Sequence, residues 1–304
     1  MLALIDADGL IFSCGFAAEK MVYELREVKD GEHIILQTWP KKKDIPDTLL
    51  GVNSEIECIF DKDDFAVYEG KQYITRRRNL EPLENALHLV KSKMLDILKE
   101  TQADDFKVYI KGIGNFRDDL AVTRKYKGNR DLTHRPTYED DIRRYLKNVW
   151  QAEEVDGMEV DDKVAMLQWP NSPLCNEAFK IHPFTIICSC DKDLLQVPGW
   201  HYNYNKKEKQ FVTELEGWRN FYESLLSGDP ADNIEGVEGI GKIGARKKLA
   251  DCKTAKEMFE VVYDCYSEVY QEKASERLSE MANLVYLIRE LDNSGKPVMW
   301  SPPK

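Results

Sequence analysis

The sequence predicts an α/β protein built on a largely parallel sheet, and two observations support this prediction. Short apolar runs at residues 2–5, 106–110 and 185–188 have the length and composition of buried strands. Helical hydrophobic periodicity separates these runs, as at residues 83–98 and 138–149. Strands that alternate with helices in this way are typical of parallel sheets joined by crossover helices.

Composition limits the class of protein. The chain has 304 residues, 42% hydrophobic and 32% charged, which is enough for one large domain or two small ones. The apolar start is followed at once by Asp6 and Asp8, and no apolar run approaches about 18 residues, so we expect a cytoplasmic protein without signal peptide or membrane span. The seven cysteines, an odd number, indicate reduced structural thiols.

Acidic residues follow the predicted strands and turns. In a parallel sheet, ligands gather at the carboxyl ends of the strands, where Asp6, Asp191 and Asp193 fall. Three more acids begin a predicted helix at 160–167, and helix capping explains one of them but hardly three. Clustered acids need cations, and hard oxygen ligands favour Mg²⁺ or Mn²⁺. We therefore predict a divalent-metal site that comprises Asp6, Glu159, Asp161, Asp162, Asp191, Asp193, Asp229 and Asp232.

The net charge of −11 is misleading as a guide to partners, because eight negative charges belong to the proposed metal cluster. Positive charge is concentrated in two short stretches. One contains Arg124, Lys125, Lys127, Arg130 and Arg135, and the other Lys242, Arg246, Lys247 and Lys248. A charge run is often only a solvated face, but two basic patches that flank an acidic centre favour nucleic-acid binding.

A glycine-rich stretch at residues 228–248 is the most specific motif in the chain. Gly239-Ile-Gly241-Lys-Ile-Gly244 matches the dinucleotide-binding fingerprint formally, but a helix and an acidic turn precede it instead of a buried strand. We favour a helix-hairpin-helix, in which Gly236, Gly239 and Gly241 let the backbone approach a phosphate and the following lysines supply cations. Residues 21–78 read as a small β elaboration to which the sequence assigns no function.

The ordered motifs resemble those of the flap endonuclease and 5′-exonuclease family, closest to bacteriophage 5′-exonucleases and the 5′-nuclease domain of bacterial DNA polymerase I. They are the strand before Asp6, Tyr126-Lys-Gly-Asn-Arg130, Glu159-Val-Asp-Asp162, Ser189-Cys-Asp-Lys-Asp193, and Gly228-Asp-Pro-Ala-Asp-Asn233 with the glycines after it. The resemblance implies a PIN-like catalytic domain at 1–215 with a helical arch or clamp at about 117–145. It also implies a helical DNA-binding region at 216–304, with the helix-hairpin-helix at about 218–250.

The resemblance also implies roles for individual residues. Asp6, Glu159 and Asp161 would surround the first metal with support from Asp162, and Asp191, Asp193, Asp229 and Asp232 would form the second-metal group. Lys127 and Arg130 match the catalytic cations of the family. Tyr126 is expected either to stack on a base or to be a core aromatic, and Arg117 either to contact phosphate or to be an ordinary surface residue. His134 in the clamp is expected to be solvated or near phosphate.

The chain departs from the family at one position. Many members have an acidic metal ligand just beyond the second core strand, where this sequence has Lys111 and Gly112. Asp118 or Asp119 is a possible substitute, and the alternatives are that Lys111 supplies charge near the phosphate or that the first metal is held more weakly. The departure puts metal affinity in doubt more than family membership.

The expected function is a Mg²⁺-dependent, structure-specific 5′-to-3′ DNA exonuclease or flap endonuclease with two metal ions, for which Mn²⁺ can substitute. K⁺ is a further candidate cation at the helix-hairpin-helix. The expected substrates are DNA 5′ ends, flaps and nicks, with RNA·DNA hybrids as a further substrate. A replicative polymerase and a single-strand-binding protein are candidate partners of a monomer. The alternatives are a PIN-like RNase and a catalytically weakened DNA-binding protein of the same fold.

Overall fold

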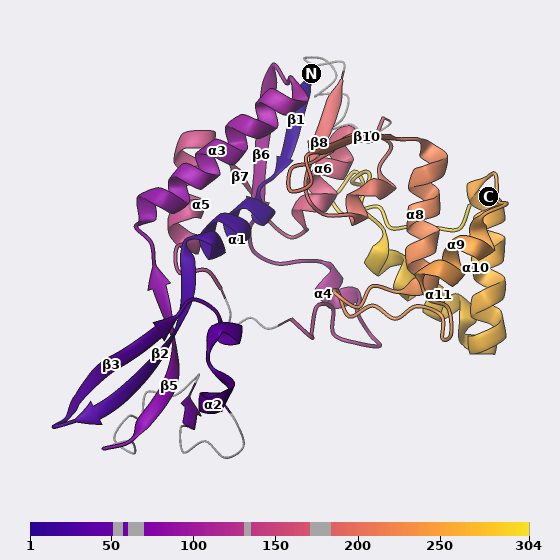
Figure 1. The fold of residues 1–304 in the computed structure, drawn as a ribbon. Coiled ribbons are helices and arrows are strands. Elements are labelled where there is room, and N and C mark those ends of the chain that lie inside the picture. The colour runs from indigo at the N-terminus through magenta and orange to yellow at the C-terminus, as the bar shows by residue number, and fades with distance from the viewer. Residues whose placement is uncertain (51–56, 60–69, 131–134, 171–183, 304) are drawn as a thin grey trace. The chain divides into compact units, whose positions relative to one another are not determined.

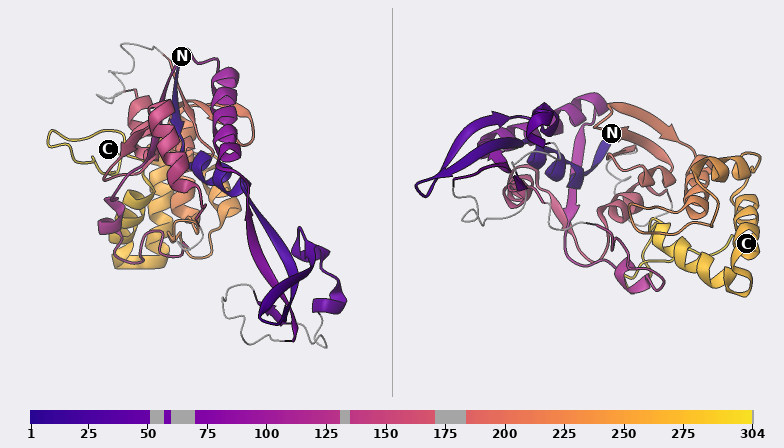
Figure 2. Two further views of the ribbon diagram at one scale, coloured as in Figure 1. Left: turned by 90° about the vertical axis from the view of Figure 1, so that its left-hand side faces the viewer. Right: turned by 60° about the horizontal axis from the view of Figure 1, so that its bottom comes forward.

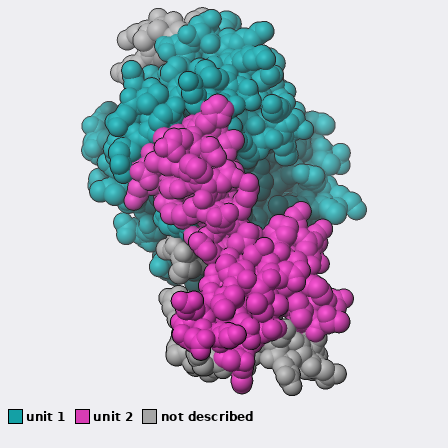
Figure 3. Space-filling view, turned by 60° about the vertical axis from the view of Figure 1, so that its left-hand side comes forward, with its two compact units in different colours: residues 1–11, 91–135, 143–304 teal, residues 12–90, 136–142 magenta. Residues whose placement is uncertain are grey.

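A computed structural model describes residues 1–50, 57–59, 70–130, 135–170 and 184–303 (Figure 1). These residues divide into two compact units, 1–11, 91–135 and 143–304 in the first and 12–90 and 136–142 in the second (Figure 3). The predicted boundary near residue 216 lies inside the first unit. The separation of a catalytic domain from a C-terminal DNA-binding region stays a prediction.

The first unit contains a six-stranded sheet in the order β10-β9-β8-β1-β6-β7. The pairs β1·β6, β1·β8, β6·β7 and β8·β9 are parallel, and only β9·β10 is antiparallel among the described strands of this sheet. The predicted α/β class with a mostly parallel sheet is therefore confirmed. The strands are β1 (Leu2–Asp6), β6 (Asp105–Lys111), β7 (Glu153–Val155), β8 (Thr185–Cys188), β9 (Gly199–Asn203) and β10 (Glu208–Val212).

The central strands are buried on both faces. Leu2 and Leu4 of β1 pack with Ile187 of β8 and with Val164 of α6 (Val160–Gln168), and the alternate residues Ala3 and Ile5 are also fully buried. Such burial explains why these strands read as continuous apolar runs instead of alternating ones. Because β1, β6, β7 and β8 are parallel, their carboxyl ends share one edge of the sheet. Asp6 lies at this edge, and the segments that carry residues 159–162 and 191–193 begin there.

Helices after the sheet form a second core in the same unit (Figure 2). Phe221, Leu225 and Leu226 of α8 pack with Val262 and Tyr266 of α10, all of them buried. Thr213 caps α8 through a capping box with Glu216, which is the reason why the helix begins there. The helices are α8 (Glu214–Ser227), α9 (Lys242–Leu249), α10 (Ala255–Tyr270) and α11 (Ala274–Val285), with the short η4 (Gln271–Lys273). The short η3 (Asp193–Gln196) comes earlier, between β8 and β9.

Three helices run from one unit into the other, and the predicted helical patterns correspond to two of them. They are α1 (Asp8–Ala17), α3 (Leu83–Thr101) and α5 (Glu139–Trp150). The first unit also contains α4 (Arg117–Leu120), a single turn. Within the described part of 117–145, this turn and α5 are the helices present. The predicted clamp residues 131–134, His134 among them, lie outside the described residues, so a helical arch stays a prediction.

The second unit is a small sheet in the order β3-β2-β5-β4. It corresponds to the β elaboration expected at residues 21–78. Leu25, Trp39, Ile45 and Ile74 form its buried core. The elements are β2 (Glu19–Lys29), β3 (Glu32–Trp39), η1 (Lys42–Asp44), α2 (Asp47–Leu50), β4 (Glu57–Ile59) and β5 (Gln72–Leu80). None of the helices in the described part of the chain combines the length and the apolar character that crossing a membrane requires.

Candidate metal centre and nucleic-acid interface

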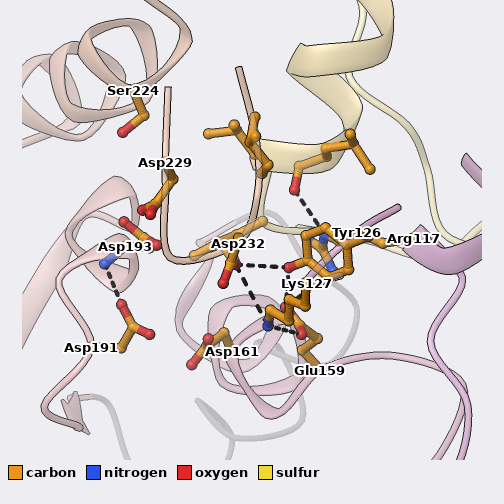
Figure 4. A pocket seen from close by; sticks show the side chains of 14 residues that line it. Arg117, Tyr126, Lys127, Glu159, Asp161, Asp191, Asp193, Ser224, Asp229 and Asp232 are labelled. Atoms are coloured by element: carbon orange, nitrogen blue, oxygen red, sulfur yellow. Dashed lines mark hydrogen bonds and ion pairs between the residues drawn. The ribbon is translucent and has the colours of Figure 1, made fainter. Parts of the chain in front are cut away.

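One pocket of the first unit collects most of the predicted acids (Figure 4). The acids come from three segments far apart in the sequence, namely the amino end of α6, the loop after β8 and the loop after α8. Glu159, Asp161, Asp191, Asp193, Asp229 and Asp232 line the pocket together with Arg117, Tyr126, Lys127 and Ser224. Six of the eight predicted acids therefore meet in one place, and Lys127 meets them.

Asp6 lies at the end of β1, beside this group of acids, and is only 7% exposed. Its Oδ2 accepts a hydrogen bond of 2.8 Å from Ser189 Oγ, which in turn accepts one of 3.0 Å from the amide of Asp191. The ends of β1 and β8 are thus joined through side chains. Burial, followed by the charge of Asp8, raises the pKa of Asp6 to about 7.

Two acids of the pocket have raised pKa values for related reasons. Burial raises the pKa of Asp161 well above its ordinary value, and the charges of Asp6 and Asp191 raise it further. Burial and the charge of Asp191 raise the pKa of Asp193 to about 6. Each acid therefore makes ionisation of its neighbours harder, which is the electrostatic condition that a bound cation relieves.

Lys127 is a cation that lies beside Glu159 and Asp232 in the pocket. Its Nζ forms an ion pair with Glu159 and lies 3.5 Å from Asp232 Oδ2. Its backbone is in the left-handed region, with φ of 52°, and its amide donates to Asp232 O at 2.9 Å. Arg130 binds the same Asp232 at 2.6 Å. Both cations expected from the family motif therefore lie at the acidic cluster.

Electrostatics of Glu159 differ from those of its neighbours. Burial opposes its ionisation, but the charges of Lys127 and Arg117 outweigh burial and hold the pKa of Glu159 below its ordinary value. Glu159 is thus an ionised carboxylate neutralised by protein cations.

The base-stacking role expected for Tyr126 is corrected by the structure. The ring is 5% exposed and packs in the helical core, with its hydroxyl 2.9 Å from Glu159 Oε2 and 3.0 Å from Asp232 Oδ2. A buried ring cannot stack on a nucleotide base, so the alternative of a core aromatic holds. Because the hydroxyl lies between two acids of the site, Tyr126 fixes their positions.

Arg117 and Asp162 are also corrected. Arg117 is 1% exposed and binds Asp162 through two hydrogen bonds of 2.6 and 2.8 Å, so it does not reach a phosphate. Asp162 is fully buried, and it also accepts from the amides of Glu159 and Ile288. Its oxygens are occupied by these donors and not available to a metal. The pair is a buried ionic link that positions Glu159.

Gly112 explains the departure after the second core strand. A Cβ at this position would lie 2.0 Å from Asp156 Oδ1 and 2.8 Å from Val155 O, so a longer side chain such as aspartate does not fit there. Asp118 and Asp119 are exposed on α4 and do not line the pocket, which contradicts the idea that they substitute for the expected acid. Lys111 instead donates its amide to Asp8 Oδ1 at 2.9 Å.

Sequence reasoning assigned no role in the site to Asp8, Ser189 or Lys192. Burial raises the pKa of Asp8, and its charge acts on Asp6. The Nζ of Lys192 lies 2.7 Å from Asp193 Oδ1 and 2.7 Å from Asp229 Oδ2. Each lies within two or three residues of an acid that was recognised, and this proximity is the signal that could have identified them.

The glycine-rich stretch joins α8 to α9, as a helix-hairpin-helix would. Gly239 has φ of +80°, which favours glycine, and Gly241 has open space around its Cα. Gly236 does not serve the approach of a ligand, because its Cβ would lie 2.4 Å from Gly228 N and 2.5 Å from Leu226 O. It is required by packing inside the hairpin. Lys242, Arg246 and Lys247 are exposed on α9, where a nucleic acid can reach them.

The donor set of the pocket fits a divalent cation in its chemistry. All the candidate ligands are hard carboxylate oxygens, and the pKa values of Asp6, Asp161 and Asp193 are raised first by burial and then by the charges of neighbouring acids. In the part of the chain that the structure describes, however, no three His, Cys, Asp or Glu side chains are arranged to hold a metal ion. Protein cations neutralise Glu159, Asp193, Asp229 and Asp232 instead, so these side chains would have to turn toward an ion.

Comparison with known proteins gives three sequence relatives. The chain is 29% identical to DNA polymerase I of Chloroflexus aurantiacus over 199 residues, which is 59% of this chain and 20% of that protein. It is 34% identical to DNA polymerase I of Borreliella burgdorferi, over 33% of this chain and 12% of that protein. It is 29% identical to a 5′-3′ exonuclease of Mycoplasmopsis pulmonis, over 34% of this chain and 36% of that protein. The matches thus span a minor part of each relative.

Solved structures that match the chain include a bacteriophage T5 flap endonuclease in a pseudo-enzyme-product complex with DNA and metal ions. It has 15% sequence identity and a TM-score of 0.45, over 76% of this chain and 99% of that chain. The catalytic core of Rad2 has 12% identity and a TM-score of 0.36, over 82% of this chain and 80% of that chain. No protein-family model matches the chain. The sequence relatives support the resemblance that the motifs predict.

Proposed function

We propose that this chain, whose relatives support a 5′-nuclease family, is a divalent-metal-dependent hydrolase that cuts DNA phosphodiesters from 5′ ends, as an exonuclease or a flap endonuclease. The observation that carries the proposal is the pocket in which acids from three segments meet Lys127. Binding alone would gain nothing from acids that face phosphate, because they repel it. Bound cations would remove this repulsion and let the same acids take part in cleavage.

The residues that would hold the metal form two groups. Asp6, Glu159 and Asp161 would hold one ion, and Asp191, Asp193, Asp229 and Asp232 the other. Mg²⁺ is the proposed ion, with Mn²⁺ as a substitute, because the donors are hard oxygens. A bound pair of such ions supplies positive charge for the phosphate oxygens and for ionisation of the attacking water.

The side chains of the protein contribute positioning and charge. Lys127 and Arg130 are tied to Glu159 and Asp232, and their cationic groups would hold the scissile phosphate when the acids turn to metal. Water adds to phosphorus, the 3′ oxygen leaves with a proton, and the products carry a 5′-phosphate and a 3′-hydroxyl. On α9, Lys242, Arg246 and Lys247 would grip the DNA backbone beside the open Gly241, without reading sequence.

A second candidate is a DNA-binding protein with little catalytic activity. It is favoured by the absence, among the described residues, of three ligands gathered for a metal, and by Gly112 in a position with no room for an acid. The proposal has four further parts, each of which needs its own experiment. They are cleavage of the RNA strand of hybrids, K⁺ binding at the hairpin, a polymerase or single-strand-binding partner, and a monomeric state.

The test is single-turnover cleavage of 5′-labelled flap, nicked, blunt duplex and RNA·DNA substrates in Mg²⁺, with EDTA as the control. We expect metal-dependent release of short 5′ products by the wild type and a loss of at least about a hundredfold in Asp191→Asn. Asp119→Asn, an exposed acid outside the pocket, should cleave as the wild type does. Tight DNA binding without cleavage in Mg²⁺ and in Mn²⁺ would establish the second candidate instead.

A further inference from the structure

Lys192 joins two loops of the first unit through a pair of ion pairs. Its Nζ lies 2.7 Å from an oxygen of Asp193 and 2.7 Å from an oxygen of Asp229. Asp193 begins η3 after β8, whereas Asp229 follows α8 and is 36 residues further along the chain. The carboxylates of these two acids lie next to each other at one side of the pocket (Figure 4). One ammonium group is therefore shared by two acids that the proposed function assigns to the second metal.

The loop that carries Lys192 is acidic. Asp191 precedes it, and the side chain of Asp191 accepts the amide of Asp193 at 2.8 Å, which turns the loop back on itself. The charges of Asp191 and Asp229 both act on Asp193. An ammonium group that bridges two such carboxylates does the electrostatic work of a bound cation, because it lowers their mutual repulsion and holds them together.

A plain surface ion pair is the simpler reading, since the Lys192 side chain is 57% exposed and such pairs contribute little to stability. Two features argue for more. The lysine contacts two carboxylates at once, from separate segments, and its partners line the pocket where the acids gather. Because the Lys192 side chain is exposed, its ammonium group can also move away from the two carboxylates without disturbing the core.

We propose that Lys192 is an internal counterion that occupies the position of the second divalent cation in the metal-free protein and leaves it when the ion binds. The proposal rests on the proposed function, because it assumes that Asp193 and Asp229 bind metal. It accounts for the finding that, among the described residues, three ligands are not gathered around one point. Lys192 therefore keeps the acids assembled before the metal arrives and weakens metal affinity.

The test measures Mn²⁺ binding directly, by electron paramagnetic resonance of the free ion, in the full chain without DNA. The variant is Lys192→Met, which keeps the length of the side chain and removes its charge. The matched control is Lys242→Met, because the charge of Lys242 also favours the ionised form of Asp229 but acts through space. We expect Lys192→Met to bind Mn²⁺ about tenfold more tightly, since two ion pairs no longer have to break, and Lys242→Met to change affinity by less than about threefold.

Thermal unfolding provides a second measurement that does not depend on activity. In EDTA, Lys192→Met should melt at a lower temperature than the wild type, because Asp193 and Asp229 then repel each other. In saturating Mn²⁺ this deficit should disappear, because the ion replaces the lysine. A deficit of the same size with and without Mn²⁺ would show that Lys192 is only a structural ion pair and would overturn the proposal.

The outcomes separate this proposal from the proposed function. If the wild type binds Mn²⁺ and Lys192→Met binds it no more tightly than Lys242→Met does, the counterion role is refuted while the metal site stands. If neither the wild type nor the variant binds Mn²⁺, both the counterion role and the metal-dependent function are refuted. Tighter binding by Lys192→Met with restored melting supports both.

Discussion

Asp6 is a buried acid whose ionisation lowers the stability of the folded protein when no metal is bound. Its pKa is raised by burial to about 7, whereas an aspartate in an unfolded chain titrates near its ordinary value of 3.8. Between these two values the folded protein holds a proton that the unfolded chain has lost. The free energy of unfolding therefore falls as the pH rises from about 4 to 7, and the contribution of Asp6 to stability is complete only below this range.

The prediction is that Asp6→Asn flattens this part of the pH dependence. We expect the metal-free wild type to lose stability between pH 5 and pH 7.5, and Asp6→Asn to lose less, by an amount of the order of a few kcal/mol. Asp161 and Asp193 keep part of the slope, because their pKa values are raised too. Urea denaturation in EDTA at the two pH values measures the difference, with Asp118→Asn, an exposed acid, as control. Parallel slopes for wild type and Asp6→Asn would contradict a raised pKa.

At the scale of elements, the ion pair of Arg117 and Asp162 connects three parts of the first unit. Arg117 begins α4, Asp162 lies in the first turn of α6, and the guanidinium also donates to Leu284 O at 3.0 Å and Tyr286 O at 2.7 Å. These two carbonyls belong to the end of α11 and the segment after it. The Arg117 guanidinium and the Asp162 carboxylate are both hydrogen-bonded. The free-energy cost of burying the two charges is therefore offset only while both side chains are present.

We predict that removing either partner is strongly destabilising and that the two effects are not additive. Arg117→Met leaves a buried carboxylate without its cation and should cost about 3–5 kcal/mol in the free energy of unfolding. Asp162→Asn should have a similar cost, and the double variant should be more stable than the sum of the two losses indicates. A double-mutant cycle by urea denaturation measures the coupling. A coupling energy near zero would mean that the backbone contacts, and not the ion pair, hold these elements together.

Several elements of the first unit were predicted from the sequence, because each of them depends on a local pattern. The strand at 185–188 and the helix at 160–167 were predicted within a residue of their ends. The antiparallel strands β9 and β10 were missed, since their register is set by pairing with β8 and by a turn instead of by an apolar run. In the candidate site, likewise, some residues were predicted correctly and others were not.

The acids of the site were predictable because they follow recognisable strands and turns. The contacts that bury Arg117 and Tyr126 were not predictable. Arg117 is buried by residues more than 160 positions away, and Tyr126 by helices that come later in the chain. Contacts of such separation leave no periodicity near the residue itself. A charged or phenolic side chain beside a basic run therefore reads as a ligand contact even when its charge or hydroxyl is used inside the protein.

At the scale of the whole molecule, the net charge of −11 opposes the binding of DNA, and the acids of the pocket are placed where that charge matters most. The exposed cations of α9 can act on the backbone of a duplex only if the phosphate near the pocket is not repelled. Divalent ions would remove this repulsion, and so would neutral substitutions of the acids. Metal should therefore control DNA affinity as well as cleavage.

We predict that the wild type binds a flap duplex at least about tenfold more tightly in Ca²⁺ than in EDTA at the same ionic strength, because each neutralised acid removes a repulsion of phosphate. In EDTA, the double variant Asp191→Asn/Asp193→Asn should bind more tightly than the wild type, and Ca²⁺ should help it less. The pair Asp118→Asn/Asp119→Asn changes the formal charge equally but lies outside the pocket, so it should leave the response to Ca²⁺ unchanged. Fluorescence anisotropy gives the affinities, and a gel of the same samples checks that the DNA stays intact. If Ca²⁺ affects the wild type and the pocket variant alike, the acids do not face the bound DNA, and the repulsion comes from the charge of the whole molecule.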